Sequence, residues 1–204
     1  NGTNPGGVSI STTGGILNVG TRDITANGDI TLVGDGITSA AGSVIDATGG
    51  DILLDGNSST QAAIALAGSV ATTSNTATAM RVVDATTLSF ANITTGSAGT
   101  TTFGNTALPL SGAVTQTGPL STGTLVGNSS TVTLNNAGNQ LANIGPYTAG
   151  GGFVLIDSNG DATQGLTFTG SVTAAGTTNI TSPGLVDLQT HDLNVGANTL
   201  TING

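Results

Sequence analysis

The feature that most constrains this chain is an alternating apolar segment that returns at a fixed interval near its N-terminus. NGDITLVG at 27–34 and GGDILLDG at 49–56 share glycine, aspartate and apolar residues at equivalent places, and a third copy places Val8 under Ile30 and Ile52. Alternation of apolar and polar residues is typical of a strand with one buried face. A unit this short cannot bury that face alone, so its regular return predicts a solenoid in which neighbouring repeats cover one another.

Composition favours strands and turns over helices. The 204 residues are 6% charged; the acidic residues are all aspartate, the basic ones are Arg22 and Arg81, and there are 33 glycines. Helix surfaces are normally built from Glu, Lys and Arg, whereas the abundant Thr, Val, Ile, Asn, Ser and Gly form strands and turns. A hydrophobic fraction of 36% with regular apolar spacing argues against disorder. We therefore expect an all-β fold.

Three short strands per repeat, separated by glycine, asparagine, aspartate and serine clusters, indicate a three-sided coil. Each strand should pair in parallel with its copy one coil further on, about 4.8 Å away. Parallel crossovers are almost always right-handed. The predicted fold is thus a right-handed parallel β-helix, or β-solenoid, with about 20–22 residues per coil.

The repeats continue through the second half, so residues 1–204 are expected to form one β-helix segment of nine or ten coils. Val132 returns as Phe153 and Val172 as Leu193 at the same spacing, and Ile180 is matched to Leu200 at a slightly shorter one. The stretch 57–80 is less regular, and we expect an irregular coil or an excursion there, with a short α-helix at 61–67 as an alternative.

The pattern runs to LTING at residues 200–204 without a polar cap. Solenoids need capped ends for solubility. We therefore expect the chain to be part of a longer protein, or its ends to associate with further copies.

Charge and hydropathy exclude some partners. A formal net charge of −9 with two arginines disfavours nucleic acid, because so few cations cannot neutralise a run of phosphates. No apolar run approaches the roughly 18 residues of a membrane-spanning helix, so no membrane insertion is expected. The absence of cysteine excludes disulfides and thiolate metal sites.

Residues 113–184 resemble the repeat region of filamentous haemagglutinin-like proteins, the large exoproteins of bacterial two-partner secretion. The resemblance lies in the order of four elements: a V-x-Q strand (AVTQ, 113–116), an L-x-x-G-x-L strand (LSTGTL, 120–125), an L-x-x-x-x-N-x-L segment (LNNAGNQL, 134–141) and a glycine-led F-x-L strand (GGGFVL, 150–155). It implies a right-handed parallel β-helix that is secreted and works at the cell surface as an adhesin, toxin carrier or fibre.

Few residues suggest catalysis. His191 is the only imidazole, and its neighbour Asp192 would point to the opposite face of a strand. Asp29 and Asp51 would stack about 4.8 Å apart, near the spacing of a retaining glycosidase pair, but the chain has only one tyrosine and four phenylalanines to line a sugar groove. We expect solvated turn aspartates and no enzyme activity.

Calcium is the one cofactor that the sequence suggests. DSNGD at 157–161 matches the D-x-N-x-D opening of an EF-hand loop, which makes Asp157, Asn159 and Asp161 candidate ligands. The acidic residue expected at loop position 12 is replaced by Phe168, and no helices are predicted beside the loop. An ordinary turn explains the same sequence without a metal.

Three functions remain open from the sequence. The first is a structural or adhesive β-helix segment of a secreted bacterial surface fibre, facing a host or neighbouring cell. The second is a self-assembling extracellular filament or matrix protein. The third is a β-helical carbohydrate-active enzyme, which the missing lysines and scarce aromatics disfavour.

Overall fold

The computed structural model describes residues 6–57, 62–159 and 165–204, and every regular element within these ranges is a β-strand. In chain order they are β1 (Val8–Ser11), β2 (Ile16–Gly20), β3 (Ile24–Ala26), β4 (Ile30–Val33), β5 (Gly36–Ser39), β6 (Val44–Ala47), β7 (Ile52–Asp55), β8 (Ile64–Thr72), β9 (Met80–Val83), β10 (Leu88–Thr94), β11 (Thr100–Phe103), β12 (Leu110–Gln116), β13 (Leu120–Leu134), β14 (Gln140–Ala149), β15 (Phe153–Ile156), β16 (Leu166–Phe168), β17 (Val172–Ala174), β18 (Thr178–Thr181), β19 (Val186–Asp187), β20 (Leu193–Asn194) and β21 (Leu200–Asn203).

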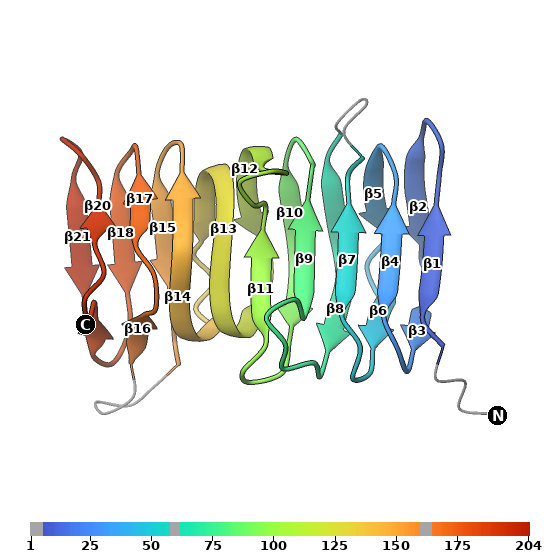
Figure 1. Cartoon of the computed structure of the whole chain (residues 1–204), viewed down its shortest axis with the longest axis horizontal. Coiled ribbons are helices and arrows are strands. Elements are labelled where there is room, and N and C mark those ends of the chain that lie inside the picture. Colours follow the sequence, from blue (N-terminus) through green and yellow to red (C-terminus); the bar gives the residue numbers. More distant parts are fainter. Residues whose placement is uncertain (1–5, 58–61, 160–164) are drawn as a thin grey trace.

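The strands pair in parallel, each with its equivalents in the neighbouring turns, and form a β-solenoid of about eight turns (Figure 1). The predicted fold class is therefore confirmed. The number of turns is below the expected nine or ten because several turns are longer than the regular repeat at the N-terminus. Ile30 pairs with Ile52, for example, but Ile52 pairs with the more distant Met80.

Each turn contributes to three faces, which we name after the strands of the first turn. The β1 face continues through β4, β7, β9 and β11. The β2 face continues through β5, the starts of β8 and β10, β12, the end of β13, β15, β18 and β21. The β3 face continues through β6 and the later parts of β8 and β10.

Apolar side chains form columns inside the solenoid. Val8 pairs with Ile30, Ile30 with Ile52 and Ile52 with Met80, so the predicted column of the first three repeats is confirmed and extended. Ile30, Ile52 and Met80 are at most 1% exposed. The outward neighbours of this column, such as Thr31, remain partly exposed, as strand alternation requires.

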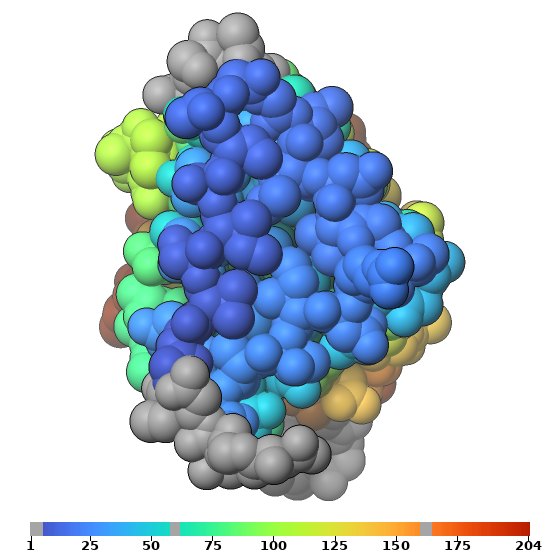
Figure 2. Space-filling view, turned by 90° about the vertical axis from the view of Figure 1, so that its right-hand side faces the viewer, coloured from blue at the N-terminus to red at the C-terminus, as the bar shows by residue number. Residues whose placement is uncertain are grey.

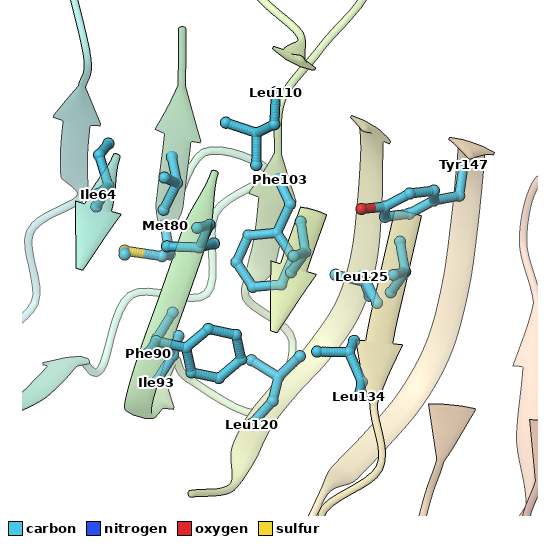
Figure 3. Packing of buried hydrophobic residues seen from close by; sticks show 14 of the residues in the cluster. Ile64, Met80, Phe90, Ile93, Phe103, Leu110, Leu120, Leu125, Leu134 and Tyr147 are labelled. Atoms are coloured by element: carbon cyan, nitrogen blue, oxygen red, sulfur yellow. The ribbon is translucent and has the colours of Figure 1, made fainter. Parts of the chain in front are cut away.

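All five aromatic side chains lie in the interior and are at most 1% exposed. Phe90 and Phe103 have ring centroids 5.5 Å apart, and both lie in the cluster shown in Figure 3. Tyr147 meets Phe153 edge to face at 5.3 Å. The aromatic residues therefore fill the core and leave none on the surface.

The expected irregularity at 57–80 is only partly correct. A helix at 61–67 is wrong, because Ile64–Thr72 is the regular strand β8. Ile64 and Leu66 point inward, while Ala65 and Ala67 point outward and are more exposed. Alanines on the outer side gave this segment the appearance of a continuous apolar run. Residues 58–61 lie outside the described ranges.

The matching of Ile180 with Leu200 is also wrong. Ile180 pairs with Ile202, and Leu200 pairs with Thr178. Because strand side chains alternate with a period of two, a shift of two residues leaves the same residues facing inward. Apolar alternation alone could not distinguish these registers. The matches of Val132 with Phe153 and Val172 with Leu193 are confirmed.

The inward and outward positions of a strand should differ in how well they tolerate a charged substitution. Replacing Ile52 with Asp buries an unpaired carboxylate between Ile30 and Met80, and we expect a loss of several kcal/mol of unfolding free energy. Thr31→Asp adds the same charge on the outer side and should cost far less. Urea unfolding of both variants measures the difference. Equal losses would contradict the inward assignment of Ile52.

Candidate functional site

The proposed calcium ligand Asp157 lies at a buried corner and is 2% exposed. Its Oδ1 accepts hydrogen bonds from the backbone N–H groups of Leu141 (2.9 Å) and Asn159 (3.0 Å), and its Oδ2 accepts one from Ser182 Oγ (3.3 Å). The Asp157 carboxylate thus links three successive turns through its hydrogen bonds. Asp161 lies outside the described residues, so calcium binding stays a prediction.

The equivalent corner one turn earlier is built by Asn139, which sequence reasoning did not single out as a functional or structural site. Its Oδ1 accepts from Leu120 N–H at 2.9 Å, as Asp157 Oδ1 does from Leu141. Its Nδ2 donates to the backbone oxygens of Leu134 and Ile156 at 3.0 and 2.9 Å. A fully buried amide therefore satisfies backbone groups on both sides of the corner.

Asn139 also pairs with the side chain of Gln116. Gln116 Nε2 donates to Asn139 Oδ1 at 2.7 Å, and Asn139 Nδ2 donates to Gln116 Oε1 at 3.0 Å. Gln116 is the glutamine of the V-x-Q element and Asn139 the asparagine of L-x-x-x-x-N-x-L. Two sequence elements separated by 23 positions thus meet in a cyclic amide pair, and this motif carries a structural role.

Asp29 and Asp51 stack at one corner, as expected, but each contacts protein donors. Asp29 Oδ1 accepts the backbone N–H of Asp51 at 2.9 Å. The Asp51 carboxylate accepts hydroxyl hydrogen bonds from Ser74 (2.6 Å), Thr76 (2.7 Å) and Thr78. The alternating hydroxyls of the connection between β8 and β9 therefore wrap around this carboxylate.

Asp51 and Asp157 experience opposite environments. Burial works against ionisation of Asp51, but the hydroxyls of Ser74, Thr78 and Thr76 and the charge of Arg81 outweigh it and lower its pKa. Burial raises the pKa of Asp157, and the hydrogen bonds from its backbone and hydroxyl donors only partly offset this effect. Asp51 therefore favours the charged form, and Asp157 resists it.

His191 lies in the turn between β19 and β20, where its backbone N–H donates to Leu188 O at 2.9 Å. Its side chain is half-buried. Asp192 follows it in the same connection, and its backbone N–H donates to Ser171 Oγ.

The glycine and proline at Gly145 and Pro146 predict a surface turn with Tyr147 as a candidate contact site. Both parts of this prediction are wrong: the three residues lie within strand β14, and Tyr147 is buried. Tyr147 is 1% exposed and its hydroxyl lies 3.1 Å from Ser129 Oγ, which is also buried. The polar hydroxyl has an interior partner, so the ring can fill the core. Pro146 alone of the three is exposed.

A surface hollow of about 290 Å³ lies beside Pro146. Its floor is formed by outward residues of successive turns, Thr102, Val126 and Pro146, and Asn105 and Thr106 of the preceding connection form one wall. Asn105 holds that connection by accepting the backbone N–H groups of Ala107 and Leu108. The hollow offers hydroxyl, amide and small apolar groups to a ligand.

The two ends of the solenoid expose large apolar side chains. Every large apolar side chain that is strongly exposed in the described ranges lies in the first or last turn; these are Ile16, Leu185, Leu200 and Ile202, at 41–59% exposure. Figure 2 shows the first turn covering the N-terminal end. In the described chain, β1 pairs with β4 on one side only and β21 with β18 on one side only. Both ends therefore present open strand edges.

Comparison with protein-family models, curated proteins and solved structures finds no match for this chain. The class that the structure defines is the β-solenoid. In the described ranges, no group of three or more His, Cys, Asp or Glu side chains is arranged to hold a metal ion. No helix of sufficient length and hydropathy to cross a membrane occurs there either.

The opposite pKa shifts predict opposite pH dependence for two matched variants. Because the pKa of Asp51 is lowered in the folded protein, Asp51 stabilises the fold at pH values above its ordinary pKa of 3.8. This stabilisation is lost as the pH falls through the pKa of Asp51 in the folded protein. Because the pKa of Asp157 is raised in the folded protein, Asp157 stabilises the fold at pH values below its ordinary pKa of 3.8. This stabilisation is lost as the pH rises through the pKa of Asp157 in the folded protein. Near neutral pH, Asp51→Asn should therefore lower Tm, and Asp157→Asn should maintain or raise it. Both differences should shrink on acidification.

Thermal unfolding followed by circular dichroism between about pH 7 and pH 3 measures these shifts. A fall in Tm for both variants near neutral pH would contradict the environment assigned to Asp157. The same samples test the calcium prediction. If Asp157, Asn159 and Asp161 bind calcium, added Ca²⁺ raises the Tm of the parent and not that of Asp157→Asn.

Proposed function

We propose that this chain is a structural and adhesive β-helix segment of a secreted bacterial cell-surface fibre. The observation that carries the proposal is a parallel ladder that continues through every turn, with stacked apolar residues inside it. Such a scaffold resists bending because each strand is hydrogen-bonded to its neighbours. Its role is mechanical: it holds exposed groups at a distance from the cell.

The outer surface suits adhesion through many weak contacts. The aromatic residues are buried, and threonine, serine, asparagine and alanine make up most outward positions. Individual polar contacts of this kind are weak, but repetition along a fibre raises the overall affinity steeply. The hollow at Thr102, Val126 and Pro146 is the contact site that we assign to the adhesive role. Its partner would be the surface of a host or neighbouring cell.

The open ends favour a second function, a self-assembling extracellular filament. Ile202 belongs to an inward column but is 41% exposed because no further turn covers it among the described residues. The first turn likewise leaves Val8, Ile10 and Leu17 only partly buried. A second copy that continues the ladder from β21 to β1 would cover these groups and satisfy the free edges. The same joint would form within a longer chain of similar turns.

End-to-end association should depend on the inward side chains of the last turn. Ile202→Asp places a charge in this joint, and we expect it to lower the apparent mass of the protein at high concentration by light scattering. Asn194→Asp is the matched control, because this residue is exposed on β20 and its Oδ1 accepts only the local Gly196 N–H. A strictly monomeric parent, or equal effects of both variants, would contradict end-to-end assembly.

The enzyme alternative predicts a different result. We expect no release of reducing sugar when the chain is incubated with a panel of polysaccharides, because the Asp51 carboxylate is held by hydroxyl donors and the aromatic residues are buried. Turnover that is abolished by Asp29→Asn or Asp51→Asn would support the carbohydrate-active enzyme instead.

A further inference from the structure

We propose that the outer side of the β2 face binds the same face of a second copy of this chain. The two copies would be related by a twofold axis that lies in the interface and runs along the strand of Thr115. This lateral contact is distinct from end-to-end assembly and does not depend on it. It would bundle fibres side by side.

The β2 face carries no charge in its central outward column. Register pairing places nine residues in this column, one per strand row: Asn18, Thr38, Ala65, Ser89, Thr115, Thr133, Val154, Asn179 and Thr201. The other two faces carry outward charges, including Asp55 and Arg81 on the β1 face and Asp46 on the β3 face. Two copies that each carry a net charge of −9 repel one another. The β2 face lets them approach without facing carboxylates.

The shape of this face is self-complementary: it has a hollow in one half and larger side chains at the equivalent place in the other half. Ala65 and Ala67 on the third row line a hollow of about 230 Å³ together with Thr38, Ser89 and Thr117. Four rows further on, the equivalent outward positions are Val154 and Ile156, which are larger. Thr115 lies on the fifth row, midway between them. Rotation about the Thr115 strand therefore brings Val154 and Ile156 of one copy over Ala65 and Ala67 of the other.

The same rotation pairs polar groups. Asn179 lies on the eighth row and is partly exposed. The twofold axis places it opposite Thr38 on the second row, which is also partly exposed. An amide and a hydroxyl can each donate and accept a hydrogen bond. This pair would therefore bond across the interface.

The face is large enough for a weak, specific contact. With rows about 4.8 Å apart and residues about 3.3 Å apart along each strand, it measures roughly 40 by 13 Å. Two copies would bury about 1,000 Å², which is at the lower end for specific interfaces. We therefore expect a concentration-dependent dimer, which chemical crosslinking is suited to trap.

The chain contains no cysteine, so single engineered thiols report the geometry cleanly. A bis-maleimide that spans about 10 Å, the separation of two packed sheets, is the probe. Thr115→Cys lies on the axis and should give a crosslinked homodimer. Ala65→Cys and Val154→Cys should each give little product alone but several-fold more when mixed, because the axis places each residue over the other. Thr31→Cys, on the outer side of the β1 face, is the control.

Two results would overturn the interface. One is product from Thr115→Cys no greater than from Thr31→Cys. The other is crosslinking of Ala65→Cys with itself as strong as in the mixture with Val154→Cys. As an independent measurement, Thr115→Arg places like charges together on the axis and should abolish the dimer in light scattering, while circular dichroism shows that the variant is still folded. Thr115→Ser keeps the hydroxyl and should keep the dimer. An unchanged dimer in Thr115→Arg would also overturn the interface. A dimer that persists in Ile202→Asp would show that the lateral contact forms without end-to-end assembly.

Discussion

The parallel ladder between successive turns is the constraint on which the rest of this structure depends. It sets each residue above the one that occupies the same place in the preceding turn, about 4.8 Å away. Side chains must therefore suit their own copies: Ile30 stacks with Ile52, and a Cβ on Gly50 would overlap the backbone of Gly28. The recurring glycine next to the aspartate in the first repeats is explained by this close approach of corners.

Backbone N–H groups in the corners also need hydrogen-bond partners in the neighbouring turn, and side-chain oxygens supply them. Asn139 and Asp157 cap backbone N–H groups one turn earlier, while Asp29 caps one a turn later. Inside the middle turns, the buried hydroxyl of Thr122 joins those of Thr95 and Thr101, each at 2.9 Å. A fold with few charges thus satisfies its interior with short amides, carboxyls and hydroxyls, and it leaves mainly small uncharged groups on the β2 face for contact with other copies.

The sequence was sufficient for the fold where turns have equal length and the inward residues are large and aliphatic. Val8, Ile30 and Ile52 meet both conditions, and their column was predicted correctly. Prediction failed where turn length varies or where both sides of a strand are apolar, as at Ile180 and at Ala65 of β8. The amide pair of Gln116 and Asn139 could not be deduced from their separation of 23 positions, because the pair forms only if the chain between them brings both residues to the same corner. The sequence elements that contain these two residues were the available signal.

Residue-level hydrogen exchange tests most directly whether the ladder holds the chain together as one rod. If stacked turns are stabilised mainly by their neighbours, opening proceeds from the ends. Amide protection should then be greatest in the middle turns, across β8, β10 and β13, and should decline toward β1 and β21. Exchange of the β13 amides as fast as those of β1, or an abrupt loss of protection at an internal boundary, would contradict a single continuous solenoid.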